Sequence, residues 1–208
     1  MMSAPHIAAA LMMNPLPALL LVVIFIAVMV MLGSRRYETA RQRRHRRYRA
    51  AAERVMTKLP QLGGDAQRLT YLRKINPYVF EELLLLAFER QGYAVARNAS
   101  YSGDGGLDGT VFIAGQTYFI QAKRYSKAIT PSHIRDFAAL LQDARCEGFF
   151  IHTGRTGHLS RTLLLAHPRV HLISGQKLLA LLAGNAEWLS FLSGNTVTQR
   201  SAFDVSSS

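Results

Sequence analysis

The sequence predicts an α/β domain with a mixed central sheet flanked by helices, preceded by one N-terminal transmembrane helix. A helical hydrophobic pattern near residue 80 is followed by three short strand patterns, and helix and strand patterns then alternate as far as residue 183. A long apolar run without charge lies close to the N-terminus. Strands that alternate with helices pair in parallel, so the whole order indicates a mixed sheet covered on both faces.

The N-terminal segment, residues 1–33, is dominated by that apolar run. No charged residue occurs at 16–32, and positions 18–32 are apolar throughout. Such a run is about the shortest that spans the hydrocarbon core of a bilayer. A cleaved secretory signal is the alternative, but its usual basic n-region and a following Ala-x-Ala site are missing. We therefore expect a transmembrane anchor over residues 16–32.

Positive charge is concentrated directly after the run. The chain carries 25 Lys and Arg against 13 Asp and Glu, and ten of these basic residues but only two acidic ones fall within 33–58. The positive-inside rule then places the N-terminus outside and everything from Ser34 onward in the cytoplasm, as in a single-pass protein of a bacterial inner membrane. Because the membrane explains most of the charge, the overall pI is poor evidence for nucleic-acid binding.

Residues 34–65 are predicted to form a basic juxtamembrane helix and a linker. Positions 35–58 contain neither Gly nor Pro, and their residue types favour a helix. The arginines can bind anionic lipid or DNA phosphate, and lipid is favoured beside a membrane span. Positions 60–65, which include Gly63 and Gly64, have the composition of a linker.

The domain itself is predicted at 66–194, followed by a disordered Ser- and Thr-rich tail at 195–208. Asn76 is a good N-cap, Pro77 suits the first helical turn, and Gly92 ends an apolar helical stripe. Later strands are predicted at 93–97, 148–151 and 170–174, and later helices at 130–145, 157–166 and 176–183.

Polar residues converge at one end of a predicted hairpin. Its first strand opens on Asp108, the chain reverses at 114–115, and its second strand ends in Gln121, Ala122 and Lys123. Alternation along a strand puts Gln121 and Lys123 on one side, and the returning chain brings the Asp108 carboxylate near them. A carboxylate, a carboxamide and an ammonium can hold a hard cation and place positive charge over a phosphate, as metal-dependent phosphodiester cleavage requires.

These residues resemble the PD-(D/E)XK nuclease superfamily, most closely its Mrr-like restriction endonuclease branch, in which glutamine replaces the second acid. The resemblance covers roughly residues 76–183. It is carried by Pro-Tyr-Val-Phe-Glu at 77–81, Ser-Gly-Asp-Gly-Gly-Leu-Asp-Gly at 102–109 and Ile-Gln-Ala-Lys-Arg-Tyr at 120–125. The resemblance implies the restriction-endonuclease-like αβββαβ core, and the order of predicted elements agrees with it.

The resemblance also implies a Mg²⁺-dependent DNA endonuclease, with Mn²⁺ as an alternative metal. Asp108 would be the principal metal ligand, supported by Glu81, the Gln121 carboxamide and the Ala122 carbonyl oxygen. Lys123 would orient the attacking water and offset charge on the phosphate. A solvated helix face is the alternative for Glu81, because helix phase is not fixed to one residue by the sequence.

DNA contacts are expected beside this set. Arg124 and Lys127 would touch backbone phosphate, and Thr153 at the end of a later strand would contact a phosphate as well. Gly105 and Gly106 permit close approach of the backbone to metal or DNA. A homodimer is a further expectation, since nucleases of this superfamily often act as dimers.

Two other classes of function remain open. One is a catalytically idle, membrane-bound DNA-tethering module, and the other is a scaffold protein of a DNA-transfer apparatus. The joint presence of Asp108, Gln121 and Lys123 favours the enzyme. Composition excludes one further class, because a single cysteine, Cys146, allows neither an internal disulfide nor a zinc site built on cysteines.

Overall fold

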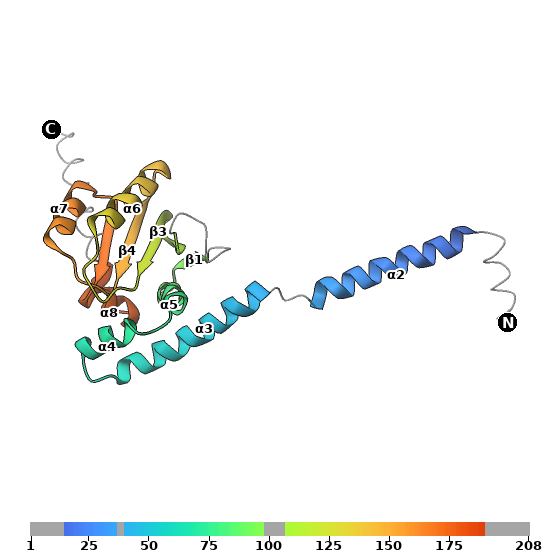
Figure 1. Ribbon diagram of the computed structural model, residues 1–208, viewed down its shortest axis with the longest axis horizontal. Coiled ribbons are helices and arrows are strands. Elements are labelled where there is room, and N and C mark those ends of the chain that lie inside the picture. The colour runs from blue at the N-terminus through green and yellow to red at the C-terminus, as the bar shows by residue number, and fades with distance from the viewer. Residues whose placement is uncertain (1–14, 37–39, 98–106, 190–208) are drawn as a thin grey trace, which may run out of the picture. The chain divides into compact units, whose positions relative to one another are not determined.

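A computed structural model describes residues 15–36, 40–97 and 107–189 of the chain (Figure 1). The chain divides into two compact units, Met1–Arg46 and Arg47–Ser208. Its helices are α2 (Pro15–Arg36), α3 (Ala40–Lys58), α4 (Asp65–Leu72), α5 (Pro77–Arg90), α6 (Pro131–Asp143), α7 (His158–Ala166) and α8 (Gln176–Ala183), with 3₁₀ turns η1 (Leu59–Gln61) and η2 (Ala186–Leu189). Its strands are β1 (Ala94–Arg97), β2 (Gly109–Ile113), β3 (Gln116–Lys123), β4 (Glu147–His152) and β5 (Val170–Ser174).

Helix α2 covers the N-terminal apolar run. Its large apolar side chains between Leu16 and Met31 are exposed. Within the part of the chain that is described, no helix combines the length and the apolar character needed to cross a membrane. The transmembrane helix predicted over residues 16–32 is therefore not supported, and the inner-membrane location and orientation stay predictions.

The sheet is mixed, as the sequence predicts, with the strand order β1-β2-β3-β4-β5. Strands β1, β2 and β3 pair antiparallel, whereas β4 runs parallel to both β3 and β5. The β2–β3 hairpin turns at Ala114 and Gly115, with φ values of 50° and 79°. Positive φ at both central residues is typical of a two-residue type I′ turn, which matches the twist of the flanking strands. The tight turn fixes the register that places Gly109 opposite Ile120.

Alternate positions of the central strands supply two separate cores, because successive side chains point to opposite faces. On one face Tyr118, Ile120 and Phe149 belong to a buried cluster that includes the apolar side chains of α5 and α8. On the other face Phe150 packs with the buried side of α6, which includes Phe137. Helices thus cover both faces of the sheet, with α5 and α8 on one side and α6 and α7 on the other (Figure 1).

The second half of α3 is part of the first core. Ala52, Val55 and Met56 are buried in the same cluster as α5. The guanidinium of Arg49 donates a 3.0 Å hydrogen bond to Glu89 Oε2 on α5. These contacts place α3 on α5 through both apolar and charged groups.

The compact unit begins at Arg47, earlier than the domain at 66–194 that the sequence predicts. It includes the second half of the segment 34–65, for which the sequence predicts a juxtamembrane helix and a linker. Residues 65–72 of the unit also form helix α4, which was not predicted. The physical reason is that apolar side chains within the arginine-rich stretch are needed to bury α5.

Most predicted elements of the domain are present. Helix α5 begins at Pro77 and is capped by Asn76, whose side-chain oxygen accepts a 2.9 Å hydrogen bond from the Tyr78 amide. Turn η2 is not predicted by the sequence. In it Trp188 is fully buried, and its ring centroid lies 5.3 Å from that of Phe88. The tail predicted at 195–208 lies outside the described residues.

Candidate active site

Asp108 is held at the C-terminal end of β3 by main-chain hydrogen bonds. Its amide donates to Ile120 O at 2.8 Å, and its carboxylate Oδ2 accepts from the Ala122 amide at 2.6 Å. Burial raises the pKa of Asp108 to about 6, opposed by the Ala122 hydrogen bond and the positive charge of Lys123. The hairpin therefore brings Asp108 to Lys123, as the sequence predicts.

Glu81 reaches the same place from the N-terminal part of α5. The pKa of Glu81 is raised to about 8, first by burial and then by the negative charge of Asp108, while the positive charge of Lys123 lowers it. Because the charges of both Asp108 and Lys123 act on Glu81, the three side chains lie near one another. Glu81, Asp108 and Lys123 thus form one site, although they come from three different elements.

The adjacent residues Glu81 and Glu82 point in different directions from α5. Glu82 is only 2% exposed, and its Oε2 accepts a 3.0 Å hydrogen bond from Arg97 Nε on β1. Arg97 Nη1 also donates to Glu89 Oε1 at 2.6 Å, so Arg97 joins two turns of α5 to the edge of the sheet. Glu82 is therefore neutralised by a structural ion pair, and Glu81 is the glutamate directed to the site.

A glycine allows α5 to come this close to the hairpin. A Cβ atom added at Gly109 would lie 2.7 Å from Leu85 Cδ2 on α5 and 3.3 Å from the Ala96 carbonyl oxygen. Any side chain at Gly109 would therefore push α5 away from the start of β2. Since Gly109 directly follows Asp108, this close packing brings α5 next to the segment that carries Asp108.

Gln121 and Lys123 occupy neighbouring positions of β3 beside β4. Gln121 is 6% exposed and lies opposite Phe150, while Lys123 lies opposite His152. His152 is fully buried, and burial lowers its pKa to about 4. Its Nε2 lies 3.2 Å from Thr156 Oγ1. A neutral imidazole thus packs beside Lys123, so the lysine carries the positive charge of this part of the site.

The predicted DNA contacts have different outcomes. Thr153 is 1% exposed, and its hydroxyl donates a 2.9 Å hydrogen bond to the Tyr125 carbonyl oxygen. The hydroxyl therefore ties together the segments that follow β3 and β4, and a direct phosphate contact through it is not available in this arrangement. Lys127 is exposed. Gly105 and Gly106 lie outside the described residues.

The oxygen atoms at the site come from few side chains. Over residues 15–36, 40–97 and 107–189, no three His, Cys, Asp or Glu side chains gather as a group that could hold a metal ion. Two carboxylates, a carboxamide and the main chain of Ala122 are what the site offers. Mg²⁺ commonly binds to one or two protein carboxylates and keeps several waters, so this donor set fits Mg²⁺ better than metals that need several nitrogen or sulfur ligands.

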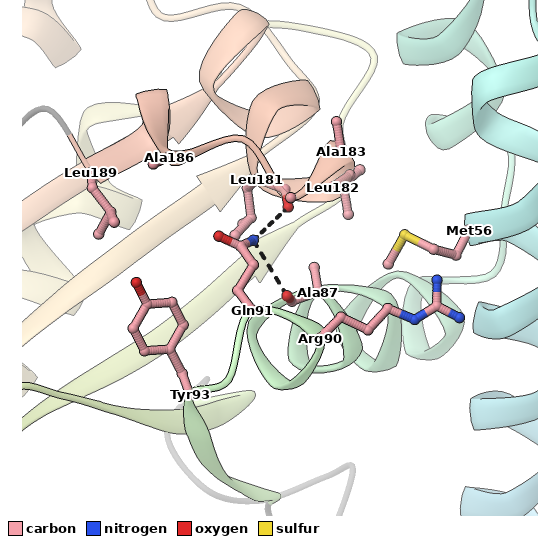
Figure 2. Close-up of a pocket in the computed structure, with 11 residues that line it drawn as sticks. Met56, Ala87, Arg90, Gln91, Tyr93, Leu181, Leu182, Ala183, Ala186 and Leu189 are labelled. Atoms are coloured by element: carbon pink, nitrogen blue, oxygen red, sulfur yellow. Dashed lines mark hydrogen bonds between the residues drawn. The ribbon is translucent and has the colours of Figure 1, made fainter.

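A separate pocket lies at the other end of α5 (Figure 2). Its volume is about 510 Å³, and its lining includes Arg90, Tyr93 and the C-terminal residues of α8. The Gln91 amide at its base donates to Ala87 O at 3.3 Å and to Leu181 O at 2.8 Å. None of the predicted site residues lines this pocket.

Comparison with known families gives one match. Residues 72–182, just over half of the 208-residue chain, match the Mrr catalytic model, which describes a restriction endonuclease. The chain belongs to this restriction endonuclease family. The matched range contains Glu81, Asp108, Gln121 and Lys123, and it is consistent with the Mrr-like branch of the PD-(D/E)XK nucleases. Comparisons with curated proteins and with solved structures found no match.

Sequence reasoning missed one residue that shapes the restriction endonuclease site. Arg97 pairs with Glu82 and Glu89, and it thereby fixes α5, the helix that carries Glu81, against β1. A signal for this pairing is present, because Glu82 and Glu89 are seven residues apart and therefore share one face of a helix. The partner arginine lies on another element, so its identity required the fold.

The two acids make the stability of the metal-free domain depend on pH. Because the pKa of Glu81 in the folded protein is about 8, well above its ordinary value of 4.5, ionisation of Glu81 destabilises the folded state as the pH rises between these values. We expect Glu81→Gln to melt several degrees above wild type near pH 8 and to show little difference near pH 5. Thermal melting in chelator across this range measures the effect. Glu187→Gln, at an exposed glutamate away from the site, is the matched control. A constant difference in melting temperature between Glu81→Gln and wild type across the pH range would contradict the assignment.

Proposed function

We propose that this restriction endonuclease domain hydrolyses phosphodiester bonds of DNA with the help of a divalent cation, Mg²⁺ or Mn²⁺. The observation that carries the proposal is the meeting of Asp108 and Glu81, both with raised pKa values, beside Lys123. Two acids that share one lysine leave a surplus of negative charge in a partly buried place. A cation relieves that surplus at neutral pH, where a proton would otherwise be held.

The donor set supports a specific arrangement of ligands. Asp108 and Glu81 would hold the cation, with the Gln121 carboxamide and the Ala122 carbonyl oxygen as further oxygen donors. When bound, such a cation polarises a phosphoryl oxygen and makes a bound water more acidic. Because glutamine stands where a second acid is usual, the affinity for metal depends strongly on Glu81.

The remaining chemistry belongs to the side chains themselves. The Ala122 amide orients Asp108 through Oδ2, and no described residue donates a hydrogen bond to Oδ1, which is therefore free to act as a ligand. Lys123 would hold its ammonium against the phosphate, offset charge that develops there and orient the attacking water. Ala122 and Lys123 are adjacent at the end of β3, so the amide that orients Asp108 and the ammonium of Lys123 are held in a fixed relation by the main chain.

The test is a cleavage assay with the full-length chain. Supercoiled plasmid, prepared methylated and unmethylated, is incubated with Mg²⁺, with Mn²⁺ or with a chelator. We expect nicked or linear DNA with either metal and intact plasmid in the chelator. DNA binding without cleavage under all conditions would instead identify the catalytically idle tethering module. Absence of both binding and cleavage would favour the scaffold protein.

A further inference from the structure

The turn between α4 and α5 is tied to the strand ends that form the site. Arg73 Nε donates a 2.8 Å hydrogen bond to the Thr153 carbonyl oxygen after β4. Arg124, which follows Lys123 directly, donates through Nη1 to the Arg73 carbonyl oxygen. Three segments that are distant in sequence are thereby joined at the edge of the sheet where Lys123 lies.

The two arginines differ in what remains available to a ligand. Arg124 Nε is buried and has no hydrogen-bond partner among the described residues, and its Nη1 is used on the Arg73 main chain. Arg73 is partly exposed, and within the described ranges the Thr153 carbonyl is the one group that accepts from its guanidinium. Both terminal nitrogens of Arg73 therefore keep their hydrogen-bonding capacity.

The neighbouring segments carry further cations. Lys74 follows it in the same turn, Lys127 follows β3, and Arg155 follows β4; all three side chains are exposed. The Arg155 amide donates to Lys127 O at 3.3 Å, so these two segments run side by side. None of the four cations forms an ion pair with an acid in the described part of the chain.

We infer that Arg73, and not Arg124, binds a backbone phosphate of the DNA next to the cleaved bond, while Arg124 positions the turn that carries Arg73. The inference rests on the proposed function, because it takes DNA as the substrate. A guanidinium with one nitrogen fixed to the protein and two free terminal nitrogens suits a phosphate, which accepts two parallel hydrogen bonds. Contacts of this kind fix the position of the duplex without reading its sequence.

The experiment measures DNA binding in the absence of cleavage. The full-length chain is titrated with a fluorescent DNA duplex in chelator at several salt concentrations, so that binding is recorded without cleavage. Each lost phosphate contact lowers the steepness of log K against log salt by about 0.9. We expect this loss for Arg73→Gln, which keeps a donor for the Thr153 carbonyl, whereas Arg73→Lys keeps the charge and the wild-type slope.

Two further variants separate the roles. Arg124→Ala should lower the melting temperature and leave the salt slope near that of wild type, because it removes a positioning contact and no phosphate contact. Arg90→Ala is the matched control, since Arg90 is an exposed arginine at the far end of α5 (Figure 2). It should change neither the slope nor the melting temperature.

The outcomes distinguish this inference from the proposed function. A wild-type slope in Arg73→Gln, or an equal loss of slope in Arg90→Ala, overturns the role of Arg73 even if the protein cleaves DNA. A reduced slope in Arg73→Gln upholds it even if no metal supports cleavage. If Arg73→Gln melts at room temperature, the folded Arg73→Lys decides the question through its affinity, because lysine keeps the charge but not the two parallel hydrogen bonds. Weaker binding at an unchanged slope upholds the contact, and wild-type affinity overturns the inference.

Discussion

Asp108→Asn and Lys123→Ala should each reduce metal-dependent DNA cleavage by about 100-fold or more. Asparagine keeps an oxygen that can accept from the Ala122 amide, but it removes the negative charge that would hold the cation. Alanine at position 123 removes the positive charge that both acids experience. The cleavage rate of plasmid at saturating Mg²⁺ measures both effects.

The fold should survive these changes. Asp108 is held at a raised pKa by burial, so its removal should leave the melting temperature unchanged or slightly higher at neutral pH. Asp136→Asn is the matched control, because Asp136 is exposed on α6 and outside the site. Wild-type cleavage rates in both site variants, or an equal loss in Asp136→Asn, would show that the chemistry lies elsewhere.

A fragment of residues 59–208 should be less stable than a fragment of residues 47–208. The shorter fragment lacks the part of α3 that carries Ala52, Val55 and Met56, all of them buried against the domain core. Burying a Val or Met side chain contributes about 1.5–3 kcal/mol each, so we expect a loss of roughly 3–6 kcal/mol in the free energy of unfolding. Urea denaturation of the two fragments measures the difference.

Point variants test the same contact in the full-length chain. Met56→Ala should cost about 2–5 kcal/mol, because it leaves a cavity between α3 and the core. Arg54→Ala, at an exposed position two residues away on the same helix, should cost little. Equal urea midpoints for the two fragments, together with a neutral Met56→Ala, would show that α3 does not contribute to the folded domain.

The hairpin with Asp108, Gln121 and Lys123 was predictable because the patterns that indicate it are local in the sequence. Strand alternation, a two-residue reversal and a short motif all lie within residues 108–123, and the observed register follows from them. The position of Glu81 was predictable only through the family resemblance. Its charge interaction with Asp108 depends on how α5 packs over Gly109, which lies 28 residues further along the chain.

The role of α3 was missed although its signal was present. Ala52, Val55, Met56 and Leu59 have the i, i+3, i+4, i+7 spacing of a buried helical stripe. The dense arginines around them favoured a membrane-surface interpretation, which outweighed the periodicity. The arginine content of α3 indicates that it can bind anionic groups, whereas the spacing of its apolar residues indicates which face of the helix is buried.

The remaining contacts could not be predicted because they join distant positions. Arg73 and Thr153 are 80 residues apart, and nothing in either neighbourhood selects the other. The Thr153 hydroxyl was expected to face DNA because it follows a strand, yet it is buried under the segment that follows β3. A position at a strand end indicates an edge of the sheet, but the loops beside it decide which groups reach solvent.

Trp188 gives the domain a natural optical reporter, because it is the single tryptophan of the chain. Its indole is fully buried, lies 5.3 Å from the ring of Phe88 and 5.8 Å from that of Phe149, and donates through Nε1 to Gln91 Oε1 at 2.8 Å. Emission from this indole therefore arises from one place, where the end of α5 meets the sheet and η2. Unfolding transfers that single fluorophore from an aromatic cluster to water, so its spectrum records the integrity of the helix that carries Glu81 without any added label.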